Sequence, residues 1–221
     1  MRRSASLALL ALLASLIGAC STGFHSSSPS TLSYVLRAAP AGGATTTAAT
    51  PSANPQPAPV SLRVMRPAAG PGLDTDRIAV LQPEARLDYF TGSRWAAALP
   101  DVVEALAVEI LQGSGAWSAV QGSRAAFTAD YELEITIRRF EADASAGSGA
   151  PTVQVIFDCA LVRRADRALL SSFAVQASEQ ASANRMGAVV ASFDQAANSA
   201  LADAAARALA AVRTPTGHSP P

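Results

Sequence analysis

The strictest pattern in this sequence is an alternation of apolar and polar side chains over residues 131–138. Successive side chains of a β-strand point to opposite faces of a sheet, so the pattern predicts a strand with one buried and one solvated face. Glu132 and Glu134 fall on the solvated face, where we expect hydrated charges rather than an acid–base pair. The apolar members are Tyr131, Leu133, Ile135 and Ile137, and the polar members are Glu132, Glu134, Thr136 and Arg138.

Two further strand candidates follow at short intervals. Residues 153–162 and 169–177 are largely apolar, and a short polar turn at 163–167 separates them. They are predicted to pair as an antiparallel hairpin, which together with residues 131–138 makes a three-strand meander. Earlier strand candidates lie at residues 61–65, 77–81 and 86–90.

Two amphipathic helices are also predicted. Apolar residues recur every three or four positions from Leu99 to Ile110, and Pro100 suits a first turn, so residues 100–112 form one helix. Asn184 is placed to cap a second helix with a narrow apolar stripe. The stripe consists of Met186, Val190, Phe193, Ala197, Leu201, Ala204 and Ala208.

The order of these elements predicts an α+β fold, with a mostly antiparallel sheet and two main helices packed on one of its faces. Asp194, Asp203 and Arg207 would be costly in hydrocarbon, so the second helix is not expected to span a membrane. We expect the folded domain to cover residues 60–213 and a disordered tail to cover 214–221.

The charge and histidine content exclude several function classes. Of the 221 residues 15% are charged, with 17 basic and 17 acidic side chains. All the basic residues are arginine and none builds a basic stripe, so nucleic acid is not an expected partner. His25 and His218 lie far from the periodic middle of the chain, which leaves nothing for a His-rich metal site or a catalytic triad. We therefore predict no catalytic residues, no metal and no cofactor.

The first twenty residues predict a secreted protein with a lipid anchor. Arginines at positions 2 and 3 precede an apolar run over residues 5–17, which is too short to span a bilayer and typical of a cleaved signal peptide. Ile17-Gly18-Ala19-Cys20 fits the site at which a lipoprotein peptidase cuts. We expect residues 1–19 to be removed and Cys20 to carry a diacylglycerol and an N-acyl chain. The alternative is an ordinary signal peptide with an incidental cysteine.

Ser21, the residue after Cys20, indicates where in the cell envelope the protein is anchored. Lipoproteins without aspartate at that position are forwarded to the outer membrane, so we expect this chain in the periplasmic leaflet of that membrane. Acylation of Cys20 leaves Cys159 as the only thiol. We expect Cys159 to be a small buried side chain on a strand rather than a nucleophile.

Residues 20–59 are expected to be the acylated cysteine followed by a low-complexity tether, because Ser, Thr, Ala, Pro and Gly dominate them. An apolar island at residues 32–37 reads as a short strand that docks on the domain; the alternative is a chance cluster. If the island docks, the remaining tether has a flexible reach of roughly 20 Å.

Several short motifs, taken in order, resemble the ABC-type transport auxiliary lipoprotein family. The resemblance covers nearly the whole mature chain and departs from the family at an insert over about residues 39–59. The motifs are Ser33-Tyr34-Val35-Leu36, Pro71-Gly72-Leu73-Asp74-Thr75-Asp76-Arg77-Ile78, Leu87-Asp88-Tyr89-Phe90, Arg94-Trp95-Ala96, Leu99-Pro100, Asp130-Tyr131-Glu132-Leu133 and Phe140-Glu141.

The resemblance implies a non-enzymatic outer-membrane adaptor of an importer-like ABC system. The periplasmic component of such a system carries mammalian-cell-entry (MCE) domains and moves lipids or other hydrophobic molecules. The implied partners are that MCE-domain protein and the membrane. The resemblance leaves open whether the chain forms a homo-oligomer. The chain has no lysine, so a Walker-type motif is absent and ATP hydrolysis belongs to another subunit. The alternatives are a structural lipoprotein of envelope assembly unrelated to transport, and a periplasmic enzyme acting on the cell wall or on lipid.

One aromatic cluster is a candidate for partner contact. Aromatic residues and arginine dominate protein interfaces, and Tyr89, Phe90, Arg94 and Trp95 lie close together in the sequence. The alternative is that Trp95 seals the edge of the core while Arg94 sits in solvent.

Overall fold

The computed structural model describes residues 31–39, 58–126, 128–147 and 149–214. The predicted signal peptide, Cys20, the insert at 40–57 and the tail from residue 215 lie outside the described residues. Within them, no helix combines the length and the apolarity needed to cross a membrane.

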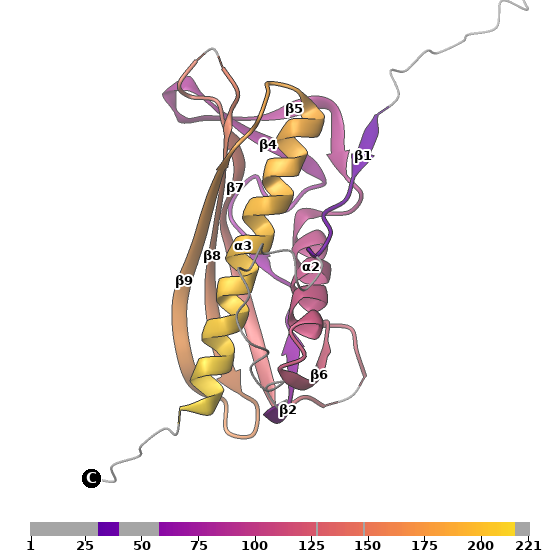
Figure 1. Cartoon of the computed structure of the whole chain (residues 1–221), viewed down its shortest axis with the longest axis vertical. Coiled ribbons are helices and arrows are strands. Elements are labelled where there is room, and N and C mark those ends of the chain that lie inside the picture. The colour runs from indigo at the N-terminus through magenta and orange to yellow at the C-terminus, as the bar shows by residue number, and fades with distance from the viewer. Residues whose placement is uncertain (1–30, 40–57, 127, 148, 215–221) are drawn as a thin grey trace, which may run out of the picture. The chain divides into compact units, whose positions relative to one another are not determined.

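The predicted meander forms the longest part of the sheet and confirms the antiparallel arrangement. β7 (Tyr131–Asp143) pairs antiparallel along its length with β8 (Thr152–Arg163), and β8 pairs in the same way with β9 (Ala168–Gln180). Figure 1 shows the three strands side by side. Arg167 closes the turn between β8 and β9 with a left-handed φ of 59°.

The second edge of β7 is shared by three short strands that run parallel to it. The shorter elements are β1 (Leu32–Tyr34), β2 (Ala58–Val64), β3 (Ala68–Ala69), β4 (Arg77–Gln82), the 3-10 turn η1 (Pro83–Ala85), β5 (Arg86–Trp95) and β6 (Trp117–Gln121). β2 pairs with the start of β7, β3 with its middle and β4 with its end. β6 extends the sheet beyond β2, β5 extends it beyond β4, and β1 lies at the outer edge of β5.

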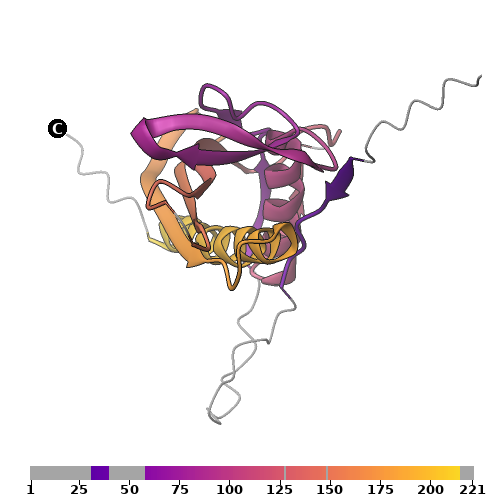
Figure 2. The same cartoon turned by 90° about the horizontal axis from the view of Figure 1, so that it is seen from above.

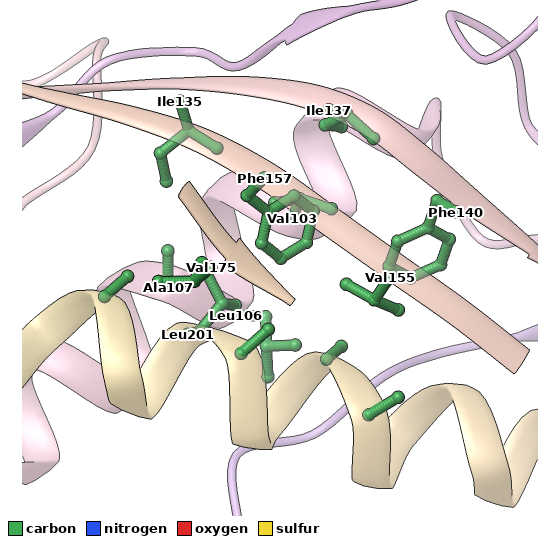
Figure 3. Packing of buried hydrophobic residues seen from close by; sticks show 14 of the residues in the cluster. Val103, Leu106, Ala107, Ile135, Ile137, Phe140, Val155, Phe157, Val175 and Leu201 are labelled. Carbon is green, nitrogen blue, oxygen red and sulfur yellow. The ribbon is translucent and has the colours of Figure 1, made fainter. Parts of the chain in front are cut away.

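Two helices cover the sheet, as predicted for this α+β fold. α2 (Leu99–Gly113) packs on β2, β3 and β6, while α3 (Met186–Arg213) packs on β8, β9 and α2. Figure 2 shows the strands curving around the helices, and Figure 3 shows side chains of both helices meeting those of β7, β8 and β9 in the interior. α3 buries mainly alanines beside Val189, Phe193 and Leu201. These small side chains let the long helix lie close to the sheet.

The start of α3 corrects one prediction, because Asn184 does not cap the helix. The helix begins at Met186, and Arg185 occupies the N-cap position without a side-chain hydrogen bond. Asn184 instead lines a hollow of about 250 Å³ together with Val80 and Phe90. A capping preference is local, whereas the packing of α3 on the sheet decides where its first turn begins.

A β-bulge in β7 decides which side chains reach the core. The register of β7 against β8 shifts between Ile137 and Arg139. An extra residue exchanges the inward and outward faces, so Phe140 points inward although it lies three positions after the inward Ile137. Phe140 stacks on Phe157 and Phe193, with ring centroids 6.2 Å and 5.0 Å apart.

Trp95 belongs to the same aromatic cluster. Its ring meets Phe140 and Phe193 edge-on, at centroid distances of 5.9 Å and 5.3 Å, and the residue is 1% exposed. The prediction that Trp95 contacts a partner is therefore wrong for this structure, because its side chain is enclosed by the core. The alternative, that Trp95 seals the edge of the core, agrees with its burial.

We predict that Trp95→Ala lowers the free energy of unfolding by about 3–5 kcal/mol, because it removes a buried aromatic side chain and leaves a cavity. Urea titration followed by circular dichroism measures the change. Leu169→Ala is the matched control, since Leu169 is 60% exposed and its loss should change stability by less than about 0.5 kcal/mol. An unchanged unfolding midpoint for Trp95→Ala would contradict the core role.

Candidate interaction surface

The N-terminal segment 31–39 is attached to the outer edge of β5. β1 runs parallel to β5, with Leu32 opposite Ser93 and Tyr34 opposite Trp95. The backbone N–H of Ala96 donates to the carbonyl of Tyr34 at 2.8 Å. The side chains of Tyr34, Leu36 and Ala38 are partly buried against the core, so every second residue of the segment packs inward.

Beyond β1, the backbone of the segment is hydrogen-bonded by side chains of the two helices instead of by a neighbouring strand. The Arg37 N–H donates to Asp194 Oδ1 at 2.9 Å, and the Ala39 N–H donates to Asn198 Oδ1 at 2.7 Å. The Asn198 amide also donates to the Arg37 carbonyl at 2.8 Å, so one side chain satisfies a donor and an acceptor of the segment. Glu109 on α2 accepts a longer bond of 3.4 Å from the Ala38 N–H.

Sequence reasoning missed this clamp of Glu109, Asp194 and Asn198. The clamp residues lie between 71 and 161 positions from the backbone groups that they bind. Polar residues on exposed helix faces are common, so their spacing along α2 and α3 carries no local signal. Only the packing of α2 against α3 brings them to one segment.

The three remaining candidate contact residues do not form one patch. The Tyr89 hydroxyl donates to the Gly72 carbonyl at 2.9 Å, and the Arg77 guanidinium lies 3.7 Å from the ring centroid. Phe90 is half-buried and lines the hollow beside Asn184. Arg94 is the exposed member, with half of its side chain accessible and an ion pair to Asp76 at 3.6 Å.

Glu132 departs from the expectation of a hydrated charge. It is 7% exposed and pairs with Arg167 at 3.2 Å and Arg164 at 3.7 Å, both from the turn between β8 and β9. Glu134 is exposed, as expected. The local alternation placed Glu132 on the outer face correctly, but the arginine side chains fold over it there. Its carboxylate holds the turn in place, which gives it a structural role.

Cys159 is buried on β8, which confirms the sequence prediction. The residue is 2% exposed, and burial, followed by the nearby Asp158 charge, raises the pKa of its thiol to about 12. The thiolate is the nucleophilic form of cysteine, so this side chain is a poor nucleophile near neutral pH.

The larger hollows in the described part of the chain are lined by alanine, glycine and acidic side chains. One of about 540 Å³ lies between α2 and α3 where the segment ends at Ala39, and Ile110 and Ala202 line it. Another, of about 450 Å³, lies between α2 and the loop after β6. At its wall Glu104 accepts the Ser123 N–H at 2.6 Å. Among residues 31–39, 58–126, 128–147 and 149–214, no cluster of His, Cys, Asp or Glu is arranged to hold a metal ion.

A family model for the ABC-type transport auxiliary lipoprotein component matches residues 34–206. The chain belongs to this family. The match begins inside the docked segment, at Tyr34, and ends in the last turns of α3. It therefore includes β5, the clamp residues and the aromatic cluster.

Solved structures agree with this assignment at the level of the fold. Protein XCC0632 from Xanthomonas campestris, of domain family DUF330, is 26% identical with a TM-score of 0.68, and the likeness covers 82% of this chain and 95% of that one. A second crystal structure, of an uncharacterized protein, is 15% identical with a TM-score of 0.55, covering 69% of this chain and 92% of that one. It shows a shared fold alone. No curated protein matches the sequence.

We predict that Asn198→Ala speeds amide hydrogen exchange in peptides covering residues 34–39 by up to about tenfold, because each lost hydrogen bond contributes about 1 kcal/mol. Exchange followed by mass spectrometry measures the effect. Asp203→Ala is the control on the same helix, since the Asp203 carboxylate pairs with Arg207 and not with the segment. Equal exchange in the two variants would show that the clamp does not hold the segment.

Proposed function

We propose that this chain is an outer-membrane lipoprotein, held in the periplasmic leaflet by acyl chains on Cys20. It serves as a non-catalytic adaptor of an ABC-type system whose periplasmic component carries MCE domains and moves lipids or other hydrophobic compounds. The family match over residues 34–206 is the observation that carries this proposal. The MCE partner and the outer-membrane location are proposed from that membership.

The attachment of the N-terminal segment supports an anchoring role. Only residues 21–31 separate Cys20 from Leu32, where β1 begins. Even a fully extended chain of this length spans no more than about 40 Å. An acyl chain on Cys20 would therefore hold the domain close to the membrane surface, within reach of a partner that approaches from the periplasm.

The acidic side chains of the hollow between α2 and the loop after β6 do not favour acid–base chemistry. Glu104 is engaged by the Ser123 N–H, and Asp101 pairs with Arg66 at 3.0 Å and with Arg124 at 3.6 Å. These carboxylates tie the start of α2 to the neighbouring loops. They are engaged within the fold, which argues against an acid–base role for this hollow.

Among the candidate contact residues, Arg94 is the one that we propose to contact the partner. Tyr89 and Phe90 are half-buried and engaged within the domain, whereas half of the Arg94 side chain is accessible beside the attached segment. Arginine anchors are common at protein interfaces. The contact is proposed for the Arg94 side of β5.

We predict that Cys20→Ala releases the protein from the membrane fraction and leaves the domain folded, because the anchor lies outside the described core. Fractionation of cell envelopes, with circular dichroism on the released protein, measures both effects. Cys159→Ala is the matched control, because it removes the buried thiol and keeps the anchor. A Cys20→Ala protein that still pellets with outer membranes after a high-salt wash would contradict anchoring by acylation.

We predict that a photo-crosslinking residue at position 94 of the anchored protein captures an MCE-domain protein in cells, identified by mass spectrometry. Position 169 is the control, because Leu169 is exposed at the start of β9, far from β5. Capture at 94 but not at 169 supports the adaptor role and its contact. Capture of cell-wall or assembly proteins alone at both positions would favour the structural-lipoprotein alternative.

A further inference from the structure

β9 is the longest of the strands that end the sheet. Its 13 residues form an antiparallel ladder with β8, and among the described strands only β8 pairs with it. The strands that end the sheet elsewhere are shorter, since β6 has five residues and β1 has three. In Figure 1, β9 is the outermost strand of the meander. An unpaired edge presents a row of backbone N–H and C=O groups that a further strand can bind.

α3 covers the inner face of β9 and does not pair with its edge. The helix packs on β8 as well as on β9, so it lies across the inner face of both strands. Its Arg207 guanidinium lies 5.9 Å from the centroid of the Phe173 ring, and Val175 is buried on the same face. Within the described residues, no hydrogen bond joins α3 to the β9 backbone. The outer face of β9 is exposed at Ser172, Ala174, Gln176 and Ser178.

The features that normally protect an edge strand are confined to the two ends of β9. Such features are charged side chains, proline and bulges that interrupt the ladder. The register shift against β8 lies at one end, between Leu169 and Ser171, and the only charged residue of the strand, Glu179, lies near the other. Residues 171–178 contain no charged residue and no proline. The middle of β9 is therefore an uninterrupted, uncharged edge.

The sequence of this edge fits a second copy of the same strand. In antiparallel pairing about a two-fold axis, residues equally far from the axis face each other. An axis at Val175 pairs residues 171–179 of one copy with the same residues of the other. The bulky Phe173 then faces the small Ala177, and the hydroxyls of Ser172 and Ser178 face each other and can hydrogen-bond.

Charge and symmetry are compatible with this pairing. Glu179 faces Ser171 of the second copy and not a like charge, which would be destabilising. It lies four positions after Val175, so roughly 26 Å of strand separates it from its own counterpart. A two-fold axis also keeps the N-terminal segments of both copies at the same height along the axis, as anchoring in one membrane requires.

We propose that the edge of β9 is a self-association surface, at which two copies of this chain pair antiparallel about Val175 and join their sheets into one. This inference goes beyond the proposed adaptor role and rests neither on the MCE partner nor on the acylation of Cys20. It leaves the proposed partner contact free, because β5 and β9 lie on opposite sides of β7 in the sheet.

The test uses the full chain expressed in cells as two differently tagged copies. One copy carries Ser172→Cys and the other carries Ser178→Cys, which the pairing places opposite each other, within reach of a disulfide. Ser172→Cys in both copies is the matched control, because each of these residues lies about 20 Å from its counterpart. We expect oxidation to link the tags in the first pair and not in the control. The native Cys159 thiol is buried, and burial raises its pKa to about 12, so it does not react.

Like charges at the axis test the register. Ala174→Lys with Gln176→Lys brings lysines of the two copies face to face and changes only exposed side chains, so circular dichroism should show an unchanged fold. We expect the linkage between positions 172 and 178 to fall by about fivefold, because like charges then lie directly opposite. A copy with Ala174→Glu and Gln176→Glu should restore linkage to the lysine copy.

Three results would overturn the inference and leave the adaptor proposal intact. They are equal linkage in the test pair and the control, no linkage in either, and linkage that the lysines do not reduce. Disulfides from positions 172 and 178 to another protein, without linkage of the two tags, would assign the edge to a different partner and also overturn self-association.

Discussion

β7 is the strand on which the rest of the domain depends, because both of its edges are paired. One edge forms a continuous antiparallel ladder with β8, and the other is divided among β2, β3 and β4. Unpaired edges leave backbone donors and acceptors without partners, so dividing the edge satisfies most of a long strand with three short ones. It also spreads the N-terminal half of the domain along the full length of β7. β6 and α2 gather beside β2, while β5 and β1 gather beside β4.

The bulge in β7 connects this arrangement to the attachment of the N-terminal segment. It falls between the part of β7 that pairs with β3 and the part that pairs with β4, and it turns Phe140 into the core. Phe140 packs against Trp95, the last residue of β5, and the next residue, Ala96, donates its N–H to Tyr34. The aromatic cluster thereby positions the strand end that receives β1. A core residue and a surface attachment site are neighbours in the chain.

This coupling gives the family assignment a physical meaning. The chain belongs to a lipoprotein family, which implies a membrane-anchored location in the cell envelope. The segment 31–39 is fixed on β5 by backbone pairing and on α2 and α3 by Glu109, Asp194 and Asn198. The segment is therefore a fixed part of the domain.

The sequence by itself determined the elements whose signal is local. The alternation over residues 131–138 predicted β7, and the polar turn at 163–167 predicted the hairpin of β8 and β9. The apolar stripe predicted the buried face of α3. Tertiary structure decided what lies beside each element. Trp95 is core because the bulge brings Phe140 to it, and Glu132 is buried because two arginines of the β8–β9 turn fold over it. The clamp residues lie far in sequence from the backbone they bind. Periodicity reports which way a side chain points, whereas its neighbours depend on pairings between segments that are distant in the chain.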